Sequence, residues 1–323
     1  MNIFLTGCAG FVGWKTGEFL LRDGHRVIGL DNLNDYYSPK LKQWRVEQLR
    51  GTGHGQFEFF EGDLLDTSLL DRLFGKEDFD AVINLAARAG VRPSIEQPVL
   101  YLETNLLAAV GLMECMRRHG VRKLVQASTS SVYAGQPAPF REDQPVDRPL
   151  SPYASSKKAA EVMAYTFHHL HGLDVSVVRY FTVYGPAGRP DMSPLKFTHH
   201  IAQGKPFPLY GDGEQRRDFT YVDDIARGTI AALKPLGYEI INLGGGNEPM
   251  SINRMIQLLE GFLGKKAVID RQPWNEADMR DTAADISKAA RLLDWHPETG
   301  PERGLKELAD WYLQEAGWLS FEL

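Results

Sequence analysis

Short apolar runs alternate with amphipathic helical patterns through most of the chain, and this alternation limits the fold more than any other feature of the sequence. The apolar runs lack the period-two alternation of half-exposed strands, so we expect strands that are buried on both faces of a parallel sheet. Such strands are expected at 3–6, 26–30, 57–61, 81–85, 123–127, 175–179 and 240–243. Helices are expected at 11–22, 68–74, 99–119, 153–171, 193–203 and 223–234. The pattern predicts an α/β fold built on a doubly wound parallel sheet.

The alternation weakens from about residue 183, where glycine and proline become denser. Segments 183–218 and 247–323 are therefore expected to form a smaller, interleaved C-terminal substrate lobe. Segment 219–246 returns to the pattern of the sheet, so the nucleotide-binding domain is expected to comprise 1–182 and 219–246. The chain would then leave the sheet once and come back to it before its end.

Composition disfavours several classes of protein. The net charge is −6 with both signs interspersed, so the basic face of a nucleic-acid-binding protein is not expected. We find no apolar run approaching the ~18–20 residues of a membrane span, so no membrane partner is expected. The chain has two cysteines, too few for a disulfide framework, and its first residues lack a signal-peptide pattern, which predicts a cytoplasmic protein. The histidines lack the spacing of common zinc sites, so no metal is expected.

A glycine-rich turn follows the first expected strand. Residues 7–13 have the spacing G-x-x-G-x-x-G and run directly into the first expected helix. Glycines allow the backbone to turn tightly and approach a pyrophosphate, and a helix N-terminus offers unpaired N–H groups to phosphates. Asp31 ends the second expected strand, where a carboxylate accepts hydrogen bonds from the ribose and disfavours a 2′-phosphate. These residues predict a Rossmann sheet that binds NAD, with an Asx turn or cap as the alternative role of Asp31.

Tyr153 and Lys157 lie four residues apart at the start of an expected helix, which places the phenol and the ammonium on one face. A tyrosine with a pKa of ~10 is a poor base at neutral pH. A lysine charge ~4 Å away, at an effective dielectric of ~20, would favour the phenolate by up to roughly 4 kcal/mol, or about three pK units. The pair is a candidate for proton transfer, with a surface helix pair as the alternative.

Hydroxyl side chains follow the strand expected at 123–127, in the run Ser128-Thr129-Ser130-Ser131. The carboxyl end of a parallel strand is where such sheets bind ligands. These hydroxyls are therefore candidates for substrate contacts, and termination of the strand by small polar residues is the alternative.

With these residues, the chain resembles the extended short-chain dehydrogenase/reductase family and, within it, the nucleotide-sugar epimerases. The resemblance also covers Asp63-Leu64, Asn84-Leu85-Ala86-Ala87, Asn105, Arg217-Asp218 and Ala284-Asp285. It implies a larger lobe that holds NAD tightly, a UDP-sugar between the two lobes, and a homodimer that packs the helices at 99–119 and 153–171. It also implies that Thr129 hydrogen-bonds to the sugar O4, that Tyr153 transfers the proton and that Lys157 contacts the nicotinamide ribose and the tyrosine.

The expected catalytic residues are Tyr153, Lys157 and Thr129. The residues expected to bind NAD are Gly7, Gly10, Phe11, Val12, Gly13, Asp31, Asn32, Asp63, Leu64, Leu85, Ala86, Ala87, Asn105, Tyr153 and Lys157. The residues expected to bind the UDP-sugar are Arg92, Thr129, Ser130, Ser131, Tyr153, Thr182, Arg189, Arg217 and Arg280. Among these, the last two are expected to contact the phosphates.

Three segments, 31–37, 89–92 and 182–192, resemble UDP-glucuronate 4-epimerases. A sugar carboxylate is best bound by charged hydrogen-bond donors, which Arg189 or Arg92 could supply. Dehydratases of this family carry an Asp-Glu pair after the threonine, and decarboxylases carry a glutamate there. Neither reaction is expected here, because Ser130 and Ser131 occupy these positions.

Other residues resemble epimerases of neutral UDP-hexoses, namely the segment 210–215 and Arg280. Arg88 and Asn84 also stand where the UDP-glucuronate enzymes usually have glutamine and histidine. The expected function is 4-epimerization of UDP-glucuronate to UDP-galacturonate, by transient C4 oxidation, rotation of the 4-keto intermediate and hydride return, with NAD regenerated in each turnover. The alternatives are a UDP-glucose or UDP-N-acetylglucosamine 4-epimerase and, more remotely, a non-catalytic nucleotide sensor.

Overall fold

The computed structural model describes residues 1–53, 55–246, 248–274, 279–315 and 317. Its centre is a seven-stranded sheet in the order β11-β6-β5-β4-β1-β2-β3, in which every neighbouring pair is parallel. The strands are β1 (Asn2–Thr6), β2 (Arg26–Asp31), β3 (Phe57–Glu61), β4 (Ala81–Asn84), β5 (Lys123–Thr129), β6 (Asp174–Tyr180) and β11 (Tyr238–Leu243). The predicted α/β class and parallel sheet are confirmed.

Helices cover both faces of the sheet, which explains why its strands are apolar throughout. Successive side chains of a strand point to opposite faces, and in β1 Ile3 and Leu5 join one core while Phe4 joins the other. The helices on the first core are α1 (Phe11–Arg22), α2 (Pro39–Gly53), α9 (Val222–Ala231) and α11 (Ser287–Leu293). Those on the second core are α3 (Thr67–Lys76), α6 (Ala108–His119) and α7 (Pro152–His171).

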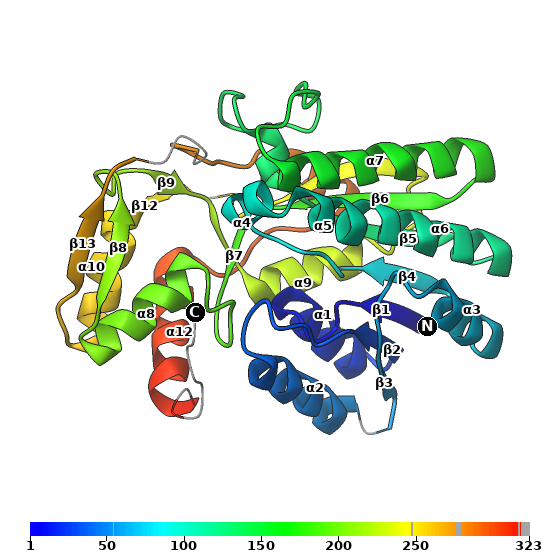
Figure 1. Ribbon diagram of the computed structural model, residues 1–323, viewed down its shortest axis with the longest axis horizontal. Helices are drawn as coiled ribbons and strands as arrows, with labels where there is room; N and C mark the ends of the chain where they lie inside the picture. Colours follow the sequence, from blue (N-terminus) through cyan, green and yellow to red (C-terminus); the bar gives the residue numbers. More distant parts are fainter. Residues whose placement is uncertain (54, 247, 275–278, 316, 318–323) are drawn as a thin grey trace.

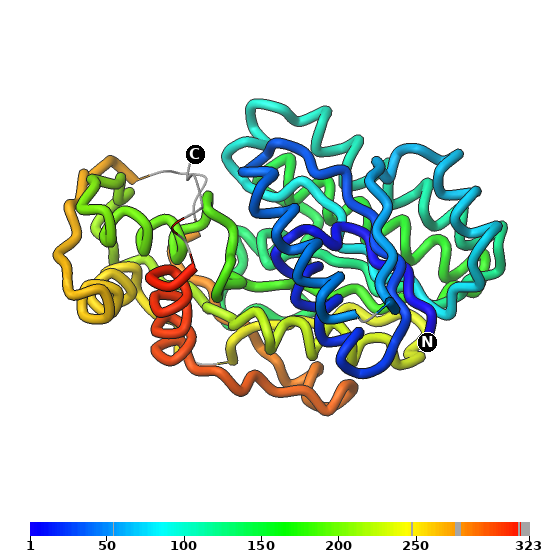
Figure 2. The backbone as a smooth tube through the Cα atoms, turned by 90° about the horizontal axis from the view of Figure 1, so that it is seen from below, coloured from blue at the N-terminus to red at the C-terminus, as the bar shows by residue number. Residues whose placement is uncertain are grey.

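A smaller group of elements lies to the left of the sheet in Figure 1 and again in Figure 2. Its elements are α8 (Ser193–Gln203), β8 (Pro206–Tyr210), β9 (Arg216–Arg217), β12 (Met250–Ser251), α10 (Ile252–Leu263), β13 (Val268–Gln272) and α12 (Pro301–Glu315). Strand β8 pairs with β13 and β9 pairs with β12. The three helices enclose a separate hydrophobic core.

Two short strands connect the sheet to the smaller group of elements. The chain leaves the sheet through β7 (Thr182–Tyr184) and returns through β10 (Phe219–Tyr221), and these two strands pair in parallel. Helix α9 and strand β11 then rejoin the larger layers. Within the segment 247–323, residues 247, 275–278, 316 and 318–323 lie outside the described part of the chain.

Some elements differ from those expected. The helix expected at 99–119 consists of α5 (Pro98–Leu102), a π-helical turn, η1 (Glu103–Leu107), and α6. A further short helix, α4 (Val91–Glu96), precedes them. Helices α2, α10 and α12 were not expected. In α2 the buried face includes Lys42 and Arg45, so the apolar periodicity that reveals a helix in a sequence is interrupted.

One helical stretch, Pro98–His119, is long and apolar enough to cross a membrane by length and composition, with a mean hydropathy of 1.4. No such stretch was expected from the sequence. In the structure its α6 portion buries Leu112, Met113 and Met116 in the second core. Because core helices of folded proteins meet the same criterion, the stretch is weak evidence for a membrane span.

Candidate active site

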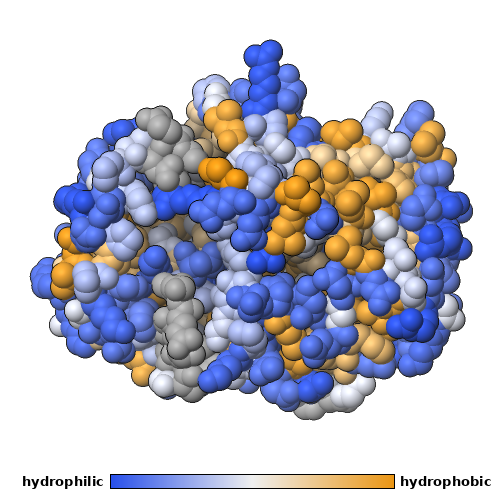
Figure 3. Space-filling view, in the orientation of Figure 1, coloured by the Kyte–Doolittle hydropathy of each residue, from blue (hydrophilic) through white to orange (hydrophobic). Residues whose placement is uncertain are grey.

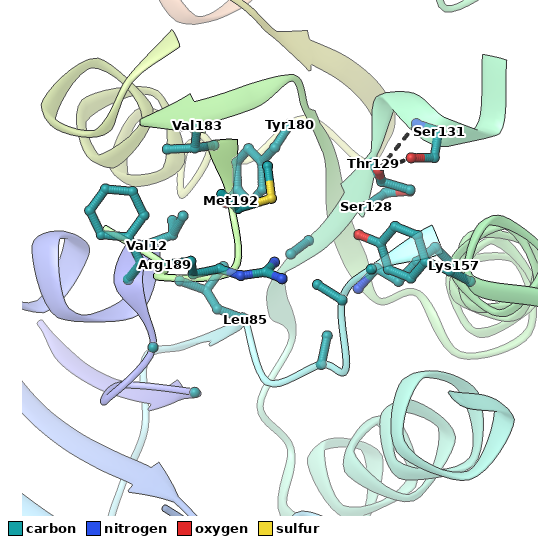
Figure 4. Close-up of a pocket in the computed structure, with 18 of the residues that line it drawn as sticks. Val12, Leu85, Ser128, Thr129, Ser131, Lys157, Tyr180, Val183, Arg189 and Met192 are labelled. Atoms are coloured by element: carbon teal, nitrogen blue, oxygen red, sulfur yellow. Dashed lines mark hydrogen bonds between the residues drawn. The ribbon is translucent and has the colours of Figure 1, made fainter. Parts of the chain in front are cut away.

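A cavity of about 340 Å³ opens where β1, β4, β5 and β6 end. Parallel strands finish at the same edge of a sheet, so residues far apart in the sequence meet there. Figure 4 shows them converging from the turn before α1, the end of β5, helix α7 and the loop after β7. The expected residues that line the cavity are Gly7, Gly10, Phe11, Val12, Gly13, Leu85, Ala87, Thr129, Ser130, Ser131, Tyr153, Lys157, Thr182 and Arg189.

Expected site residues outside the lining of this cavity are Asp31, Asn32, Asp63, Leu64, Ala86, Arg92, Asn105, Arg217 and Arg280. Asn105 is buried and holds the backbone of Arg88 from both sides, accepting from its N–H at 2.7 Å and donating to its carbonyl at 2.9 Å. Asn32 donates to Asp63 at 2.8 Å, so these two residues meet beyond the end of β2. Their expected contacts with NAD stay predictions.

The glycine turn leaves no room for side chains at two positions. Gly7 has a φ of 68°, and a Cβ on it would lie 2.7 Å from the Ala86 nitrogen. A Cβ on Gly13 would lie 2.0 Å from the Gly7 carbonyl oxygen. Gly10 is the N-cap of α1 and contributes no side-chain hydrogen bond. The first N–H groups of α1 therefore remain available to an anion, which fits the pyrophosphate of a dinucleotide.

Asp31 lies where β2 ends and takes part in local hydrogen bonds. Its carboxylate accepts from the N–H groups of Ala9 at 3.1 Å and Leu33 at 2.9 Å. Burial raises its pKa, while these two N–H groups lower it. The bond to Leu33 is the Asx turn considered as the alternative role, and the bond to Ala9 ties the carboxylate to the glycine turn. A carboxylate oxygen accepts more than one hydrogen bond, so a ribose contact remains compatible with both.

Helix α7 places Tyr153 and Lys157 on the cavity. Ser151 caps the helix by accepting from the Ala154 N–H at 3.2 Å, and Pro152 takes the first helical position. Lys157 is 3% exposed. Burial lowers its pKa to about 8, against the opposing charge of Glu161.

The pKa of the Tyr153 phenol is shifted in the direction opposite to the expected one. We predicted that Lys157 would lower its pKa, but in the free protein burial raises the pKa of Tyr153, and the Thr129 hydroxyl and the Arg189 guanidinium lower it by less. The physical reason is the loss of hydration, which disfavours a phenolate. Positive charge added to the cavity would lower the pKa of Tyr153 and favour the phenolate.

A buried ion pair lies behind these residues. Glu161, one turn after Lys157, accepts two hydrogen bonds from Arg179 of β6, at 2.8 and 2.7 Å. It also accepts from the Ser128 hydroxyl at 2.6 Å. Glu161 and Arg179 are both fully buried and were not identified from the sequence. A glutamate one turn after the lysine, on the buried face of the same helix, was the available signal.

The hydroxyl run after β5 forms a compact group. The Ser131 N–H and hydroxyl lie 3.1 and 3.2 Å from the Thr129 Oγ1, as the dashed lines in Figure 4 show. This geometry begins the short 3-10 helix η2 (Ser130–Tyr133). All four residues of the run, Ser128, Thr129, Ser130 and Ser131, line the cavity.

Arg189 points into the cavity from the opposite side to Thr129 and Lys157 (Figure 4). Its Nε donates to Asp191 at 3.0 Å, its Nη2 donates to the second oxygen of the same carboxylate, and its guanidinium lies over the Tyr36 ring. Although burial opposes its charge, Asp191 raises the pKa of Arg189. With Nε and Nη2 held by Asp191, the Nη1 group is the one left to a further anion.

The other expected arginines lie on or near the smaller group of elements. The Arg92 guanidinium from α4 lies 4.0 Å from the ring centroid of Tyr210 in β8. Arg217 donates to the Arg280 carbonyl at 3.1 Å, and Arg280 pairs with Asp212 at 3.5 Å. Arg217 and Arg280 are thus neighbours, as a shared phosphate role would require.

Several cavity residues were not assigned from the sequence. They are Tyr36, Tyr37, Ala89, Gly90, Val91, Ala127, Tyr180, Phe181, Val183 and Met192. Seven of them, Tyr36, Tyr37, 89–91, Val183 and Met192, belong to segments whose likeness to UDP-glucuronate 4-epimerases was noted. The other three resemble ordinary core residues in sequence, so no pattern distinguished them.

Comparison with known proteins supports this site. The profile of the NAD dependent epimerase/dehydratase family matches residues 3–244. The UDP-glucuronate 4-epimerase of Thermodesulfobacterium geofontis (strain OPF15) is 56% identical over 307 residues, covering 95% of this chain and 94% of that protein. UDP-glucuronate 4-epimerase 1 of Arabidopsis thaliana is 39% identical, covering 98% and 78%.

Solved structures agree with the sequence relatives. UDP-glucuronic acid 4-epimerase from Bacillus cereus, in complex with UDP-glucuronic acid and NAD, has a TM-score of 0.90 at 35% identity, covering 97% of this chain and 99% of that chain. UDP-glucose 4-epimerase from Thermotoga maritima, with UDP-glucose, has a TM-score of 0.85 at 29% identity, covering 97% and 99%. The fold is therefore shared by enzymes for acidic and neutral sugars.

The lowered pKa of Lys157 predicts a pH dependence. As the pH rises through about 8, the lysine loses the charge that favours the Tyr153 phenolate, so kcat/KM should fall above that pH. Lys157→Arg keeps its charge, and its profile should lack this fall even if its turnover is low. Steady-state rates between pH 6 and 10 would measure both profiles. An alkaline fall at the same pH in the two proteins would contradict the assignment.

Proposed function

The chain belongs to the NAD dependent epimerase/dehydratase family, and we propose that it is a UDP-glucuronate 4-epimerase that converts UDP-glucuronate to UDP-galacturonate. One observation carries the choice of reaction: Lys157 and Thr129 face Arg189 across a cavity that Tyr153 also lines. A proton-transfer group thus shares a cavity with a donor for a carboxylate. The relative that is 56% identical bears this activity in its name.

The residues around the glycine turn fit NAD. The turn has no space for side chains at Gly7 and Gly13, and the first N–H groups of α1 are available to a pyrophosphate. Asp31 stands at the end of β2, where its charge disfavours a 2′-phosphate. When bound, NAD supplies the acceptor, and later the donor, of the C4 hydride.

Tyr153 carries the proton in both directions. It takes the proton of the C4 hydroxyl as that carbon is oxidised, and it returns the proton when the opposite face of the 4-keto sugar is reduced. The Thr129 hydroxyl lowers the pKa of the phenol, lines the same cavity and is placed to hold the sugar O4. Lys157 supplies positive charge from one turn further along α7. The substrate gains and loses the same atoms, so there is no net oxidation.

The chemistry of the hydroxyl run supports epimerization over related reactions. Ser130 and Ser131 line the cavity beside Thr129 and bear no carboxyl group. A dehydration needs an acid and a base to remove water, and a serine hydroxyl is a weak candidate for either role. Neutral hydroxyls can hold the sugar and its carboxylate while leaving the carbon skeleton intact.

Turnover of three nucleotide sugars tests the reaction. UDP-glucuronate, UDP-glucose and UDP-N-acetylglucosamine are incubated in parallel with the protein, and products are identified by chromatography and NMR. We expect UDP-galacturonate from the first, without accumulation of NADH or release of carbon dioxide. Tyr153→Phe should lower turnover by on the order of 10²–10⁴-fold while retaining UDP-glucuronate binding. Near-normal turnover of this variant would refute the proton-transfer role.

The choice of an acidic sugar rests on Arg189. Its remaining Nη1 group faces a cavity lined with hydroxyls, and a hydrogen bond from a charged donor contributes roughly 1.5–3 kcal/mol. Neutral UDP-hexoses are the alternative substrates, supported by the Asp191 carboxylate that already neutralises much of the Arg189 charge. The two substrates can be separated by a substitution of the arginine.

Arg189→Met should lower kcat/KM for UDP-glucuronate by about 10–150-fold, because a charge-assisted hydrogen bond is lost. Any turnover of UDP-glucose should change much less. Arg92→Met is the matched comparison, since Arg92 was the other candidate for the carboxylate and lies against Tyr210. Equal losses for both sugars in Arg189→Met would contradict an acidic substrate, and a selective loss in Arg92→Met would transfer the role to that residue.

The UDP moiety is proposed to bind at the smaller lobe. Arg217 and Arg280 are neighbours there, and arginine suits the recognition of a diphosphate. Because the 4-keto sugar has to rotate, contacts to the sugar must be replaceable. Most of the binding free energy is therefore expected from the nucleotide, which stays in place.

We propose in addition that the protein is a homodimer located in the cytoplasm. Large apolar side chains are exposed on α5, η1 and α7, and Figure 3 shows an apolar surface over these helices. They are Val99, Leu102, Leu107, Val162, Tyr165 and Leu170. A contiguous apolar face of this kind is typical of an association surface. The location is supported by Cys8 and Cys115, which are both free thiols, as is usual in a reducing compartment.

The dimer can be tested by charged substitutions on this face. Val99→Lys combined with Leu107→Glu places charges where a second copy would pack, so the mass measured by light scattering should fall from two chains to one. Leu313→Glu is the control, because Leu313 is equally exposed but lies on α12. A wild-type protein of one chain, or an unchanged mass in the double variant, would contradict the proposed surface.

A further inference from the structure

Arg45 of α2 is a buried cation whose hydrogen bonds all go to neutral groups. Its Nη1 donates to the Ala9 carbonyl at 3.0 Å and to the Tyr37 hydroxyl at 2.6 Å. Its Nη2 donates to the carbonyls of Ala187 at 2.7 Å and Gly188 at 3.1 Å. The side chain is fully buried, and Nε has no partner in the described structure. Buried guanidinium groups usually pair with a carboxylate or phosphate, so this arrangement requires an explanation.

The hydrogen-bond acceptors of Arg45 come from two parts of the proposed site. Ala9 lies inside the glycine turn that is suited to the pyrophosphate, whereas Ala187 and Gly188 lie in the loop that leads to Arg189. The two parts also touch directly, since a Cβ on Gly188 would lie 3.6 Å from the Phe11 ring. Arg45 thus joins the cofactor turn to the segment that presents Arg189 to the sugar.

The loop needs such a connection to keep its shape. Ala187 has a φ of 53°, a left-handed conformation that is unfavourable for a residue with a side chain. It is nevertheless fully buried. The hydrogen bonds from Arg45 to its carbonyl and to the next one hold this conformation in place, and they act immediately before Arg189.

The charges around Arg45 are incompletely balanced in the free protein. Asp31 interacts electrostatically with both Arg45 and Lys42. Lys42 also interacts with Asp35 and Arg88, so two negative charges face three positive ones. Lys42 is 4% exposed and donates to the Asn34 carbonyl at 2.6 Å. A diphosphate on the glycine turn would supply negative charge to this group, which Arg45 joins to the turn through the Ala9 carbonyl.

We propose that Arg45 is a positioning residue that couples NAD binding to the ordering of loop 185–189, and so prepares Arg189 for the sugar. The proposal rests on the proposed function for the identity of the sugar, but not for the coupling itself. Coupling between two sites is reciprocal, so a bound UDP-sugar should also strengthen the retention of NAD. Such coupling would keep NAD in place during a reaction that does not consume it.

Hydrogen exchange measures the coupling without relying on turnover. Full-length protein is stripped of NAD, and amide exchange is followed by mass spectrometry with and without added NAD. In the wild type, we expect NAD to slow exchange in both segments, 7–13 and 185–190, by about fivefold or more. In Arg45→Met, NAD should slow exchange in 7–13 but leave 185–190 nearly unchanged. Equal protection of 185–190 in both proteins would overturn the proposal.

Arg45→Lys separates the charge from the bridging geometry. A lysine keeps the positive charge, but an ammonium lacks the planar fork that reaches both carbonyl groups. We expect this variant to recover most of the NAD affinity and little of the protection in 185–190. If Arg45→Met does not fold, hydrogen exchange of the wild type with and without NAD still tests the coupling. Absence of NAD-dependent protection at 185–190 would then refute it. Arg50→Met, an exposed arginine on the same helix, is the matched control and should behave as the wild type.

Ligand binding distinguishes failure of this proposal from failure of the proposed function. Affinities for UDP-glucuronate and for UDP are measured by calorimetry on the NAD-bound proteins. Arg45→Met should weaken UDP-glucuronate on the order of tenfold and leave UDP unchanged, whereas general damage would weaken both. A wild type that does not favour UDP-glucuronate over UDP-glucose would refute the substrate, while the exchange result at 185–190 would still decide the role of Arg45.

Discussion

The buried ion pair between Glu161 and Arg179 is the interaction on which the geometry of the site most depends. It joins α7 to β6, and the hydroxyl of Ser128 attaches the end of β5 to the same carboxylate. Tyr153 and Lys157 on α7 are thereby fixed relative to Thr129, the next residue after Ser128. Removing one partner of such a pair leaves an uncompensated buried charge, at a cost of about 3–5 kcal/mol. The relative positions of these three side chains therefore depend on a network that the loss of either partner of the ion pair would disrupt.

Burial has opposite consequences for the two ionisable groups of α7. It raises the pKa of Tyr153 and lowers that of Lys157, so each group is pushed toward its neutral form. Further positive charge in the cavity favours the phenolate, and the nicotinamide ring of NAD would carry such a charge when bound.

The sheet and much of the cavity could be predicted from the sequence because their signals are local. Apolar runs, the glycine spacing at 7–13 and the Tyr153/Lys157 pair each reflect a requirement of neighbouring residues. The contributions of Arg179 and Arg45 could not be predicted in this way, and the signal for Glu161 was only its place one turn after Lys157. Each is a buried charge whose partners lie on other elements, and in sequence it resembles a surface residue. The prediction that the pKa of Tyr153 is lowered was wrong for the same reason, since the burial of the phenol depends on the whole fold.

The two arginines Arg45 and Arg189 show how an acidic protein can be built to bind anions. The chain has a net charge of −6, which would repel a dinucleotide and a sugar nucleotide at long range, yet screening weakens that repulsion beyond ~10 Å. Inside the protein, the balance of nearby charges determines how strongly an anion is bound. Asp191 keeps Arg189 charged and oriented, and Asp31 partly offsets Arg45 and Lys42. Each buried cation is therefore stable without its ligand but has spare charge for it, so that affinity is set by these few groups and not by the total charge.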